Sequence, residues 1–526
     1  MTRYIPQPPN LFRLLLDWLR SLFTPKPNPA SIQKPPMSTH TFFWHDYETF
    51  GLSPRTDRPS QFAGIRTDSE LNEIGAPLMV YCQPPGDYVP SAESTLITGI
   101  TPQYCAQQGV PEHQFAAQVH AALSEGGTVG VGYNTIRFDD EFTRHLLWRN
   151  LYDPYGREWQ NRCGRWDLLD VLRAYRALRP DGIVWPTAVD TKNGGTYPSL
   201  KLTDLTTANG IAHEGAHDAL SDVRATIAMA RLARNANPKL FDACFALHKK
   251  DAVSEAIGLI GAQGKPFVHI SKQYPAERGN IALVWPLAAH PTNKNEIIVW
   301  DLSADPRELA QLTPDDVKLR LFTKTEDLPA GVTRLPIKTI HINKSPMVFA
   351  NLKVLSPEQA AHWGVDVNAA HANAAHMAAL LVSQNLWPLW ESVFAAREFE
   401  PDDNVDHGLY QGFIGNEDKR ILERLRALSP ADLAATQPVF KDARLTELLL
   451  RYRARNFPAY LTTDETAEWA ARCAAIKAGQ VDNPGINMKG LRSVAALQAE
   501  IDTLSANATA AQRGLMQQVL DYANGL

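Results

Sequence analysis

The sequence predicts a mixed α/β domain, then a small β-barrel domain, then an all-α domain, and three features of its pattern indicate this order. From Thr41, strand-like and helix-like segments alternate, as in an α/β layer. After Pro238, short strand-like segments follow one another at close spacing. Beyond about Pro357 the chain is rich in alanine and helical in periodicity. A length of 526 residues also favours several domains.

The individual elements follow from local periodicity and length. In the α/β part, strands are expected at 41–45, 78–82 and 128–133, and helices at 113–124, 139–150 and 218–236. In the β part, strands are expected at 266–271, 281–287, 296–302 and 337–343. In the α part, Ser429 followed by Pro430 is typical of a helix start.

The first residues differ from the rest. The first 36 contain eight prolines and one short amphipathic stripe, between Leu11 and Leu22, with charges beside it. A secretory signal would have an uncharged apolar core and a small-residue cleavage site, which this segment lacks. An amphipathic partner-binding or membrane-surface helix is the alternative. Because Met37 opens a new segment that suits a start, we expect residues 1–37 to be a tail.

The composition excludes several protein classes. An apolar fraction of 44% with 21% charged residues is typical of a folded globular chain, and no apolar run has the roughly 18 residues that a membrane span needs. The net charge of −5 argues against non-specific coating of nucleic acid but permits a local basic groove. The five cysteines form no C-x-x-C pair, so we expect neither a zinc site nor a disulfide framework, and a cytoplasmic location.

A pair of acids lies in the first predicted strand. In "FFWHDYETFG", Asp46 and Glu48 are two residues apart, so in a strand they share one face. Two carboxylates held this close repel each other unless a cation lies between them. The spacing therefore predicts a cation-binding pair.

Further polar residues fall near the ends of later elements. Asp139 opens the helix after the strand that ends near Asn134, and His217 precedes Asp222 by five residues. Taken singly, Asp139 is most simply a helix cap, His217 a surface residue and Asp222 an exposed helix acid. Together with the D-x-E pair, they supply the parts for two-metal phosphodiester chemistry. Oxygen ligands suit two Mg²⁺ ions and also accept Mn²⁺, and a histidine titrates in the range that a general base needs.

The five positions in order resemble the DEDDh branch of the DnaQ-like 3′-to-5′ exonucleases: Asp46, Glu48, Asp139, His217 and Asp222. The segment "LITGIT" at 96–101 resembles the part of that branch that packs beside the terminal nucleotide. Longer segments are similar to the exodeoxyribonuclease I family of bacteria: "DYETFG" at 46–51, "DRPSQFAGIRTD" at 57–68, "GRWDLLDV" at 164–171, "HINKSP" at 341–346 and "YRARNFP" at 452–458.

This resemblance implies a fold and an activity. It implies a ribonuclease-H-like exonuclease domain at 38–236, an SH3-like β-barrel domain at 237–398 and a helical C-terminal domain at 399–526. It also implies processive 3′-to-5′ digestion of single-stranded DNA to nucleoside 5′-monophosphates in DNA repair and recombination. The resemblance further implies that the four acids bind two metal ions and that His217 is the general base. The implied partners are single-stranded DNA and single-stranded-DNA-binding protein, and we expect a monomer with no membrane association.

Basic and aromatic residues are interleaved between positions 137 and 179, a combination that suits single-stranded nucleic acid. Our candidate contacts there are Arg144, Tyr155, Trp159 and Arg173. Trp166 is more simply a core residue, and several of the arginines are equally expected to pair with nearby aspartates. Lys201 matches a basic position of the resembled family, with lysine in place of the expected arginine.

Three arginines in the last part allow two interpretations. Arg451, Arg453 and Arg455 surround Tyr452 and either face a channel or form a solvated face beside Glu447. Two alternative functions also remain: an exonuclease of the same branch acting on RNA or short oligonucleotides, and a catalytically silent nucleic-acid-binding scaffold. The length of chain after position 236 favours an exonuclease acting on single-stranded DNA over one acting on RNA or short oligonucleotides. The intact set of acids favours an active enzyme over a silent scaffold.

Overall fold

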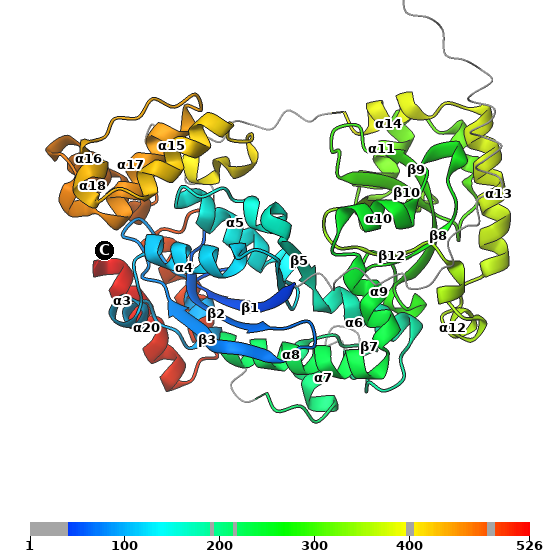
Figure 1. The fold of residues 1–526 in the computed structure, drawn as a ribbon, viewed down its shortest axis with the longest axis horizontal. Coiled ribbons are helices and arrows are strands. Elements are labelled where there is room, and N and C mark those ends of the chain that lie inside the picture. Colours follow the sequence, from blue (N-terminus) through cyan, green and yellow to red (C-terminus); the bar gives the residue numbers. More distant parts are fainter. Residues whose placement is uncertain (1–39, 190–193, 214–217, 396–403, 481–489, 526) are drawn as a thin grey trace, which may run out of the picture. The chain divides into compact units, whose positions relative to one another are not determined.

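The computed structural model describes residues 40–189, 194–213, 218–395, 404–480 and 490–525 (Figure 1). The predicted tail at 1–37 lies outside these residues. So does His217, the predicted general base. Among the described residues, none of the helices is both long enough and apolar enough to cross a lipid bilayer.

The first domain is built on a mixed five-stranded sheet. Its strands are β1 (Thr41–Thr49), β2 (Pro59–Thr67), β3 (Glu73–Tyr81), β4 (Thr128–Gly132) and β5 (Gly164–Asp167). The strand order is β3-β2-β1-β4-β5. The strands β1, β2 and β3 pair antiparallel, whereas β4 runs parallel to β1 and β5 runs parallel to β4. The predicted strands at 41–45, 78–82 and 128–133 are confirmed, while β2 and β5 were not anticipated as strands.

The helices of this domain cover both faces of the sheet. They are α2 (Ala92–Thr98), α3 (Pro102–Gln108), α4 (Glu112–Ser124), α5 (Asp139–Arg149), α6 (Leu168–Leu178), α7 (Leu202–Ala208) and α8 (Ala219–Ala236). Figure 1 shows α4 and α5 on one side of β1 and α8 on the other. A short hairpin, β6 (Thr187–Val189) and β7 (Thr196–Pro198), precedes α7. The helices predicted at 113–124, 139–150 and 218–236 are confirmed.

Alternation along β1 decides which side chains meet which helices. Phe43 and Tyr47 join one buried cluster that includes Phe115 of α4. Phe42 and Trp44 point to the other face and join the cluster that includes Val223 of α8. Asp46 and Glu48 continue this second series, because residues two apart in a strand share a face. The strand therefore directs both acids toward the α8 side.

The second domain contains an antiparallel half-barrel with helices packed on it. Its strands are β8 (Phe267–Ile270), β9 (Ile281–Ala289), β10 (Glu296–Asp301), β11 (Ile337–His341) and β12 (Met347–Phe349), in the order β11-β10-β9-β8-β12. This confirms the predicted small β domain, and β12 is an additional strand. Its helices and those that lead into it are α9 (Pro238–Ala246), α10 (Lys250–Ile257), α11 (Pro314–Phe322), α12 (Pro357–His362), α13 (Val367–Ser383) and α14 (Trp387–Val393).

The last part is helical, as predicted. Its helices are α15 (Asn416–Arg426), α16 (Pro430–Ala435), α17 (Arg444–Asn456), α18 (Thr463–Ala478), α19 (Val494–Ser505) and α20 (Ala510–Gly525), preceded by the 3₁₀ helix η9 (Val405–Tyr410). Ser429 caps α16 through its side chain, as the sequence indicated. Leu497 and Val519 pack against Val89 and Ala92, so α19 and α20 share a core with the first domain.

Candidate active site

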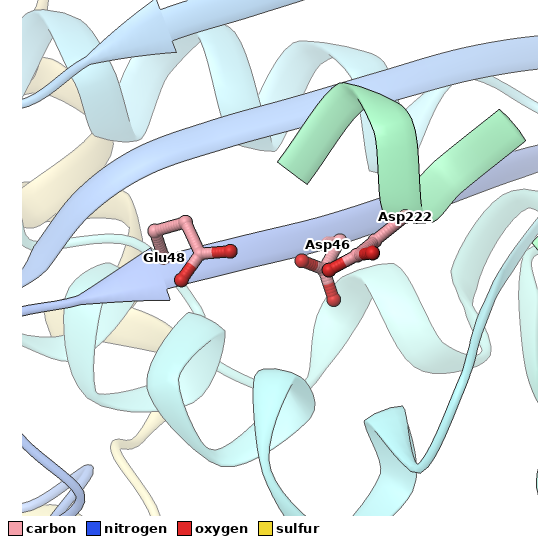
Figure 2. Close-up of side chains that lie close together, drawn as sticks. All are labelled: Asp46, Glu48 and Asp222. Carbon is pink, nitrogen blue, oxygen red and sulfur yellow. The ribbon is translucent and has the colours of Figure 1, made fainter. Parts of the chain in front are cut away.

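Three carboxylates converge at the face of β1 that meets α8. Asp46 and Glu48 leave the same side of the strand, and Asp222 reaches them from the first turn of α8 (Figure 2). One carboxylate oxygen from each of the three lies within 4.8 Å of the others. Residues 46 and 222 come from distant parts of the sequence, so this convergence is a product of the fold.

Asp139 reaches the same end of the sheet by a different route. Because β4 runs parallel to β1, the loop after β4 emerges beside the end of β1 that carries Asp46 and Glu48. Asn134 turns this loop with a positive φ of 67°, and Asp167 accepts hydrogen bonds from the backbone N–H groups of Asn134 and Ile136 at 2.9 and 3.2 Å. Asp139, the first residue of α5, is buried and accepts a 3.1 Å hydrogen bond from the backbone N–H of Tyr47.

The electrostatics of the cluster favour neutralisation. Burial, followed by the neighbouring Asp139, Glu48 and Asp222 carboxylates, raises the pKa of Asp46 well above its usual value. Burial and the charge of Asp222 raise the pKa of Glu48 to about 8. Burial also raises the pKa of Asp139. The protein alone therefore disfavours full ionisation of this cluster.

The donor set fits a divalent cation. Carboxylate oxygens are the ligands that Mg²⁺ and Mn²⁺ take in proteins, and here three of them already lie within reach of one ion. A cation among them would offset the repulsion that raises the pKa values of Asp46 and Glu48. The arrangement of these carboxylates is therefore better explained by a metal-binding site than by a group of independent surface acids.

Two further polar residues border the cluster and were not singled out from the sequence. Asp218 caps α8 and accepts a 3.2 Å hydrogen bond from the Gln61 side chain, and its charge adds to the repulsion on Asp46 and Glu48. The Nε2 atom of His213 hydrogen-bonds to Asp222, with the imidazole side chain only 5% exposed. Asp218 is the first residue of the helix predicted at 218–236, and an acid at a helix start is a signal for a cap. Nothing in the local sequence distinguished His213 from the nearby His217.

The residues predicted to contact a nucleic-acid strand lie in different environments. Arg144 is buried, donates to Glu158 at 2.7 and 2.9 Å and to Glu141 at 2.8 Å, and lies 5.3 Å from the ring centre of Tyr155. Tyr155 is half-buried and meets Phe413 edge-on. Trp159 is 66% exposed, which leaves a large aromatic face available.

The other two candidate contacts lie on separate elements. Arg173 is buried on α6 and pairs with Asp170 one turn before it. Lys201 is exposed at the residue before α7. Trp166 is fully buried, as the simpler interpretation required.

The arginines of α17 match neither interpretation drawn from the sequence. Arg451 and Arg455 are buried and pair with Asp406, and Arg455 also pairs with Asp87. Arg453 forms a partly buried pair with Glu465. Arg451 and Arg455 therefore face neither a channel nor solvent, because buried carboxylates from other segments neutralise them.

Models of three protein families match consecutive parts of the chain. A family described as "Exonuclease" matches residues 43–230, the "Exonuclease I SH3-like domain" matches residues 248–396, and the "Exonuclease I C-terminal domain" matches residues 403–526. The three matches follow the α/β, β and α order of the structure.

Individual proteins are similar over most of their length. Exodeoxyribonuclease I of Escherichia coli strain K12 is 45% identical over 430 residues, 82% of this chain and 88% of that protein. The structure of exonuclease I from Methylocaldum szegediense is 44% identical, with a TM-score of 0.82, and the match covers 92% of this chain and 99% of that one. A zinc-bound complex of E. coli exonuclease I with single-stranded DNA is 40% identical, with the same TM-score and coverage. This chain therefore belongs to the exodeoxyribonuclease I family, and its first domain is an exonuclease domain.

Proposed function

We propose that this protein hydrolyses single-stranded DNA from its 3′ end with the help of divalent metal ions and releases nucleoside 5′-monophosphates. The observation that carries the proposal is the convergence of Asp46, Glu48 and Asp222 beside Asp139, in a chain whose relatives are exodeoxyribonucleases. E. coli exonuclease I forms complexes with single-stranded DNA and has a zinc-bound form, which supports both the substrate and the need for metal.

Each polar group has a proposed role in the reaction. Asp46, Glu48, Asp139 and Asp222 hold two Mg²⁺ ions, and Mn²⁺ suits the same oxygens. When bound, the ions stabilise charge on the attacking and the leaving oxygens of the phosphodiester. His217 takes the proton of the attacking water, whose oxygen forms a bond to phosphorus while the bond to the 3′ oxygen of the preceding nucleotide breaks. His213 holds Asp222 in position through its hydrogen bond.

The domains after the nuclease support a processive mode of action on a long strand. A strand held between domains cannot diffuse away after each cleavage, and the chain carries two domains beyond the nuclease. Trp159 and Tyr155 provide aromatic surface for bases, and Arg144, Arg173 and Lys201 provide positive charge for the backbone. We propose a monomer that works with single-stranded-DNA-binding protein in DNA repair and recombination. The five cysteines are all free, in keeping with the reducing cytoplasm.

The competing functions make different predictions about substrate and metal. An RNA or short-oligonucleotide enzyme would prefer RNA, and a silent scaffold would bind a strand without cutting it. The test is digestion of a 3′-labelled single strand with and without Mg²⁺, compared with the same strand annealed and with RNA. We expect metal-dependent release of mononucleotides from the single DNA strand only, and loss of this release in Asp46→Ala with strand binding retained. Equal digestion of RNA, or wild-type turnover by Asp46→Ala, would contradict the proposal.

A further inference from the structure

A turn of the SH3-like domain is fixed against the nuclease sheet. Residues 342–346 connect β11 and β12 and carry the "HINKSP" segment. Arg165 of β5 donates a 2.9 Å hydrogen bond to the backbone carbonyl of Asn343, and the hydroxyl of Ser345 donates a 3.0 Å hydrogen bond to the backbone carbonyl of Arg165. Lys344 lies between these two anchors, so its backbone is held beside the exonuclease domain.

Lys344 is a half-buried cation among other cations. Burial is the main reason that its pKa is lowered, and the nearby charges of Arg144, Arg165 and Arg137 lower it further. Glu141 acts in the opposite direction, but this carboxylate already accepts a 2.8 Å hydrogen bond from Arg144. Three arginines and one carboxylate therefore lie close enough to Lys344 to influence its charge.

The neighbouring arginines differ from Lys344 because each has a carboxylate partner. Arg165 pairs with Asp140 at 3.1 Å, and Arg144 pairs with Glu158 at 2.7 Å. Arg137 pairs with Asp170 at 2.9 Å through one nitrogen, Nη2. Lys344 forms no ion pair with any residue in the described ranges of the chain.

Arg137 provides a second free donor near the same turn. Its Nη1 atom is buried and has no hydrogen-bond partner among the residues that the structure describes. A buried guanidinium N–H without an acceptor is costly, because it has lost water without gaining a replacement. Arg137 also precedes Asp139, the first residue of α5, by only two residues.

We infer that Lys344 Nζ and Arg137 Nη1 bind a backbone phosphate of the DNA strand near its 3′ end. This inference rests on the proposed function, since it takes the strand to be the ligand. A phosphate supplies the negative charge that the described residues do not supply to Lys344, and an acceptor for the N–H of Arg137. The SH3-like domain then contributes directly to substrate binding, through a side chain that its turn presents to the nuclease domain.

The test is the salt dependence of strand binding. Each phosphate neutralised in a single strand contributes about 0.7 to the slope of log K against log salt concentration. We expect Lys344→Gln to reduce that slope by about 0.7 when a fluorescent oligothymidylate is titrated in EDTA, which prevents cleavage. Lys344→Arg should keep the parent slope. In Mg²⁺, Lys344→Gln should raise KM for the strand several-fold while kcat changes little.

Lys318→Gln is the matched control, because Lys318 lies on α11 of the same domain and already faces Asp315 at 3.8 Å. Thermal melting of each variant checks that the fold is kept, and Lys344→Met offers a second neutral replacement that retains the apolar stem. If the parent binds and digests the strand but Lys344→Gln and Lys344→Met match it in slope and affinity, the Lys344 inference is overturned while the proposed function stands. If the parent neither binds nor digests a single strand, both fail.

Discussion

Arg455 of the C-terminal helical domain and Asp87 of the exonuclease domain form a two-pronged ion pair in the interior of the protein. The Nε and Nη2 atoms of Arg455 donate to the two carboxylate oxygens of Asp87 at 3.0 and 2.6 Å. The side chains are 2% and 0% exposed. Asp406 of η9 accepts from the same guanidinium at 2.6 and 2.8 Å. One arginine thus connects segments 368 residues apart.

Removing Arg455 should lower the stability of the protein. The variant Arg455→Met leaves two buried carboxylates with less compensation, and breaking a buried ion pair costs about 3 to 5 kcal/mol. We expect the free energy of unfolding in urea to fall by that amount. Arg453→Met is the matched control, because Arg453 lies on the same helix and its partner Glu465 is 24% exposed, so losing this pair should cost less than losing the fully buried pairs of Arg455. Equal losses in the two variants would contradict the structural role of Arg455.

Glu48 should contribute a loss of stability to the metal-free protein as pH rises from about 6.5 to 8. The pKa of Glu48 is raised from 4.5 to about 8 in the folded protein, so in this range the folded state binds more protons than the unfolded state. The stability that protonated Glu48 contributes below pH 4.5 is therefore lost as pH rises through its folded-state pKa. Buried histidines such as His269, with a pKa lowered to about 4, act in the opposite direction, but a variant that changes only Glu48 shares them with the parent, so their contribution cancels in the comparison.

The variant Glu48→Gln isolates this effect. One proton released on unfolding changes stability by about 1.4 kcal/mol per pH unit, so the parent should lose roughly 1 to 2 kcal/mol more than Glu48→Gln between pH 6.5 and 8. The measurement is urea unfolding in EDTA at each pH. Parallel pH dependences in the two proteins would show that Glu48 is already ionised in the folded state at pH 6.5.

Those parts of the fold and site that depend on local pattern were predictable. Alternation in β1 requires Asp46 and Glu48 to share a face whatever surrounds the strand, and the start of α5 fixes Asp139. The strand β2 was missed because it is buried on both faces and carries Ser60 and Gln61 within the core, so its apolar residues do not alternate. The strand β5 has only four residues.

The partners of the α17 arginines could not be predicted. The local sequence shows Arg451 and Arg455 one helical turn apart beside Glu447, which is equally typical of a solvated face. Their burial depends on Asp87 and Asp406, and only the tertiary fold brings these residues to the helix. The hydrogen bond from His213 to Asp222 is likewise a product of the loop conformation rather than of spacing.

Loss of His217 should slow hydrolysis without abolishing metal binding. A general base contributes typically about 10² to 10⁴ in rate, so kcat of His217→Ala should fall within that range. Because an imidazole titrates near pH 6.5, the acid limb of the parent's kcat profile should disappear in the variant. Single-turnover rates across pH, at saturating Mg²⁺, test this. An unchanged acid limb would remove His217 from the role of base.

His213 should act on metal affinity instead. It hydrogen-bonds to Asp222, and loss of such an outer partner of a metal ligand typically weakens metal binding by about 10- to 100-fold. We expect His213→Ala to need correspondingly more Mg²⁺ for half-maximal activity, with the acid limb of the pH profile retained at saturating metal. A lower Mg²⁺ requirement in His213→Ala would indicate that the imidazole competes with the metal for Asp222.

Asp46, Glu48, Asp139 and Asp222 are proposed to form one site for divalent metal ions. Anomalous diffraction from crystals soaked in Mn²⁺ locates such ions, with crystals of Asp46→Asn as the comparison. We predict anomalous peaks bounded by these four carboxylates in the parent, and weakened or missing peaks in Asp46→Asn. Manganese bound elsewhere, with no peak among these four side chains, would contradict it.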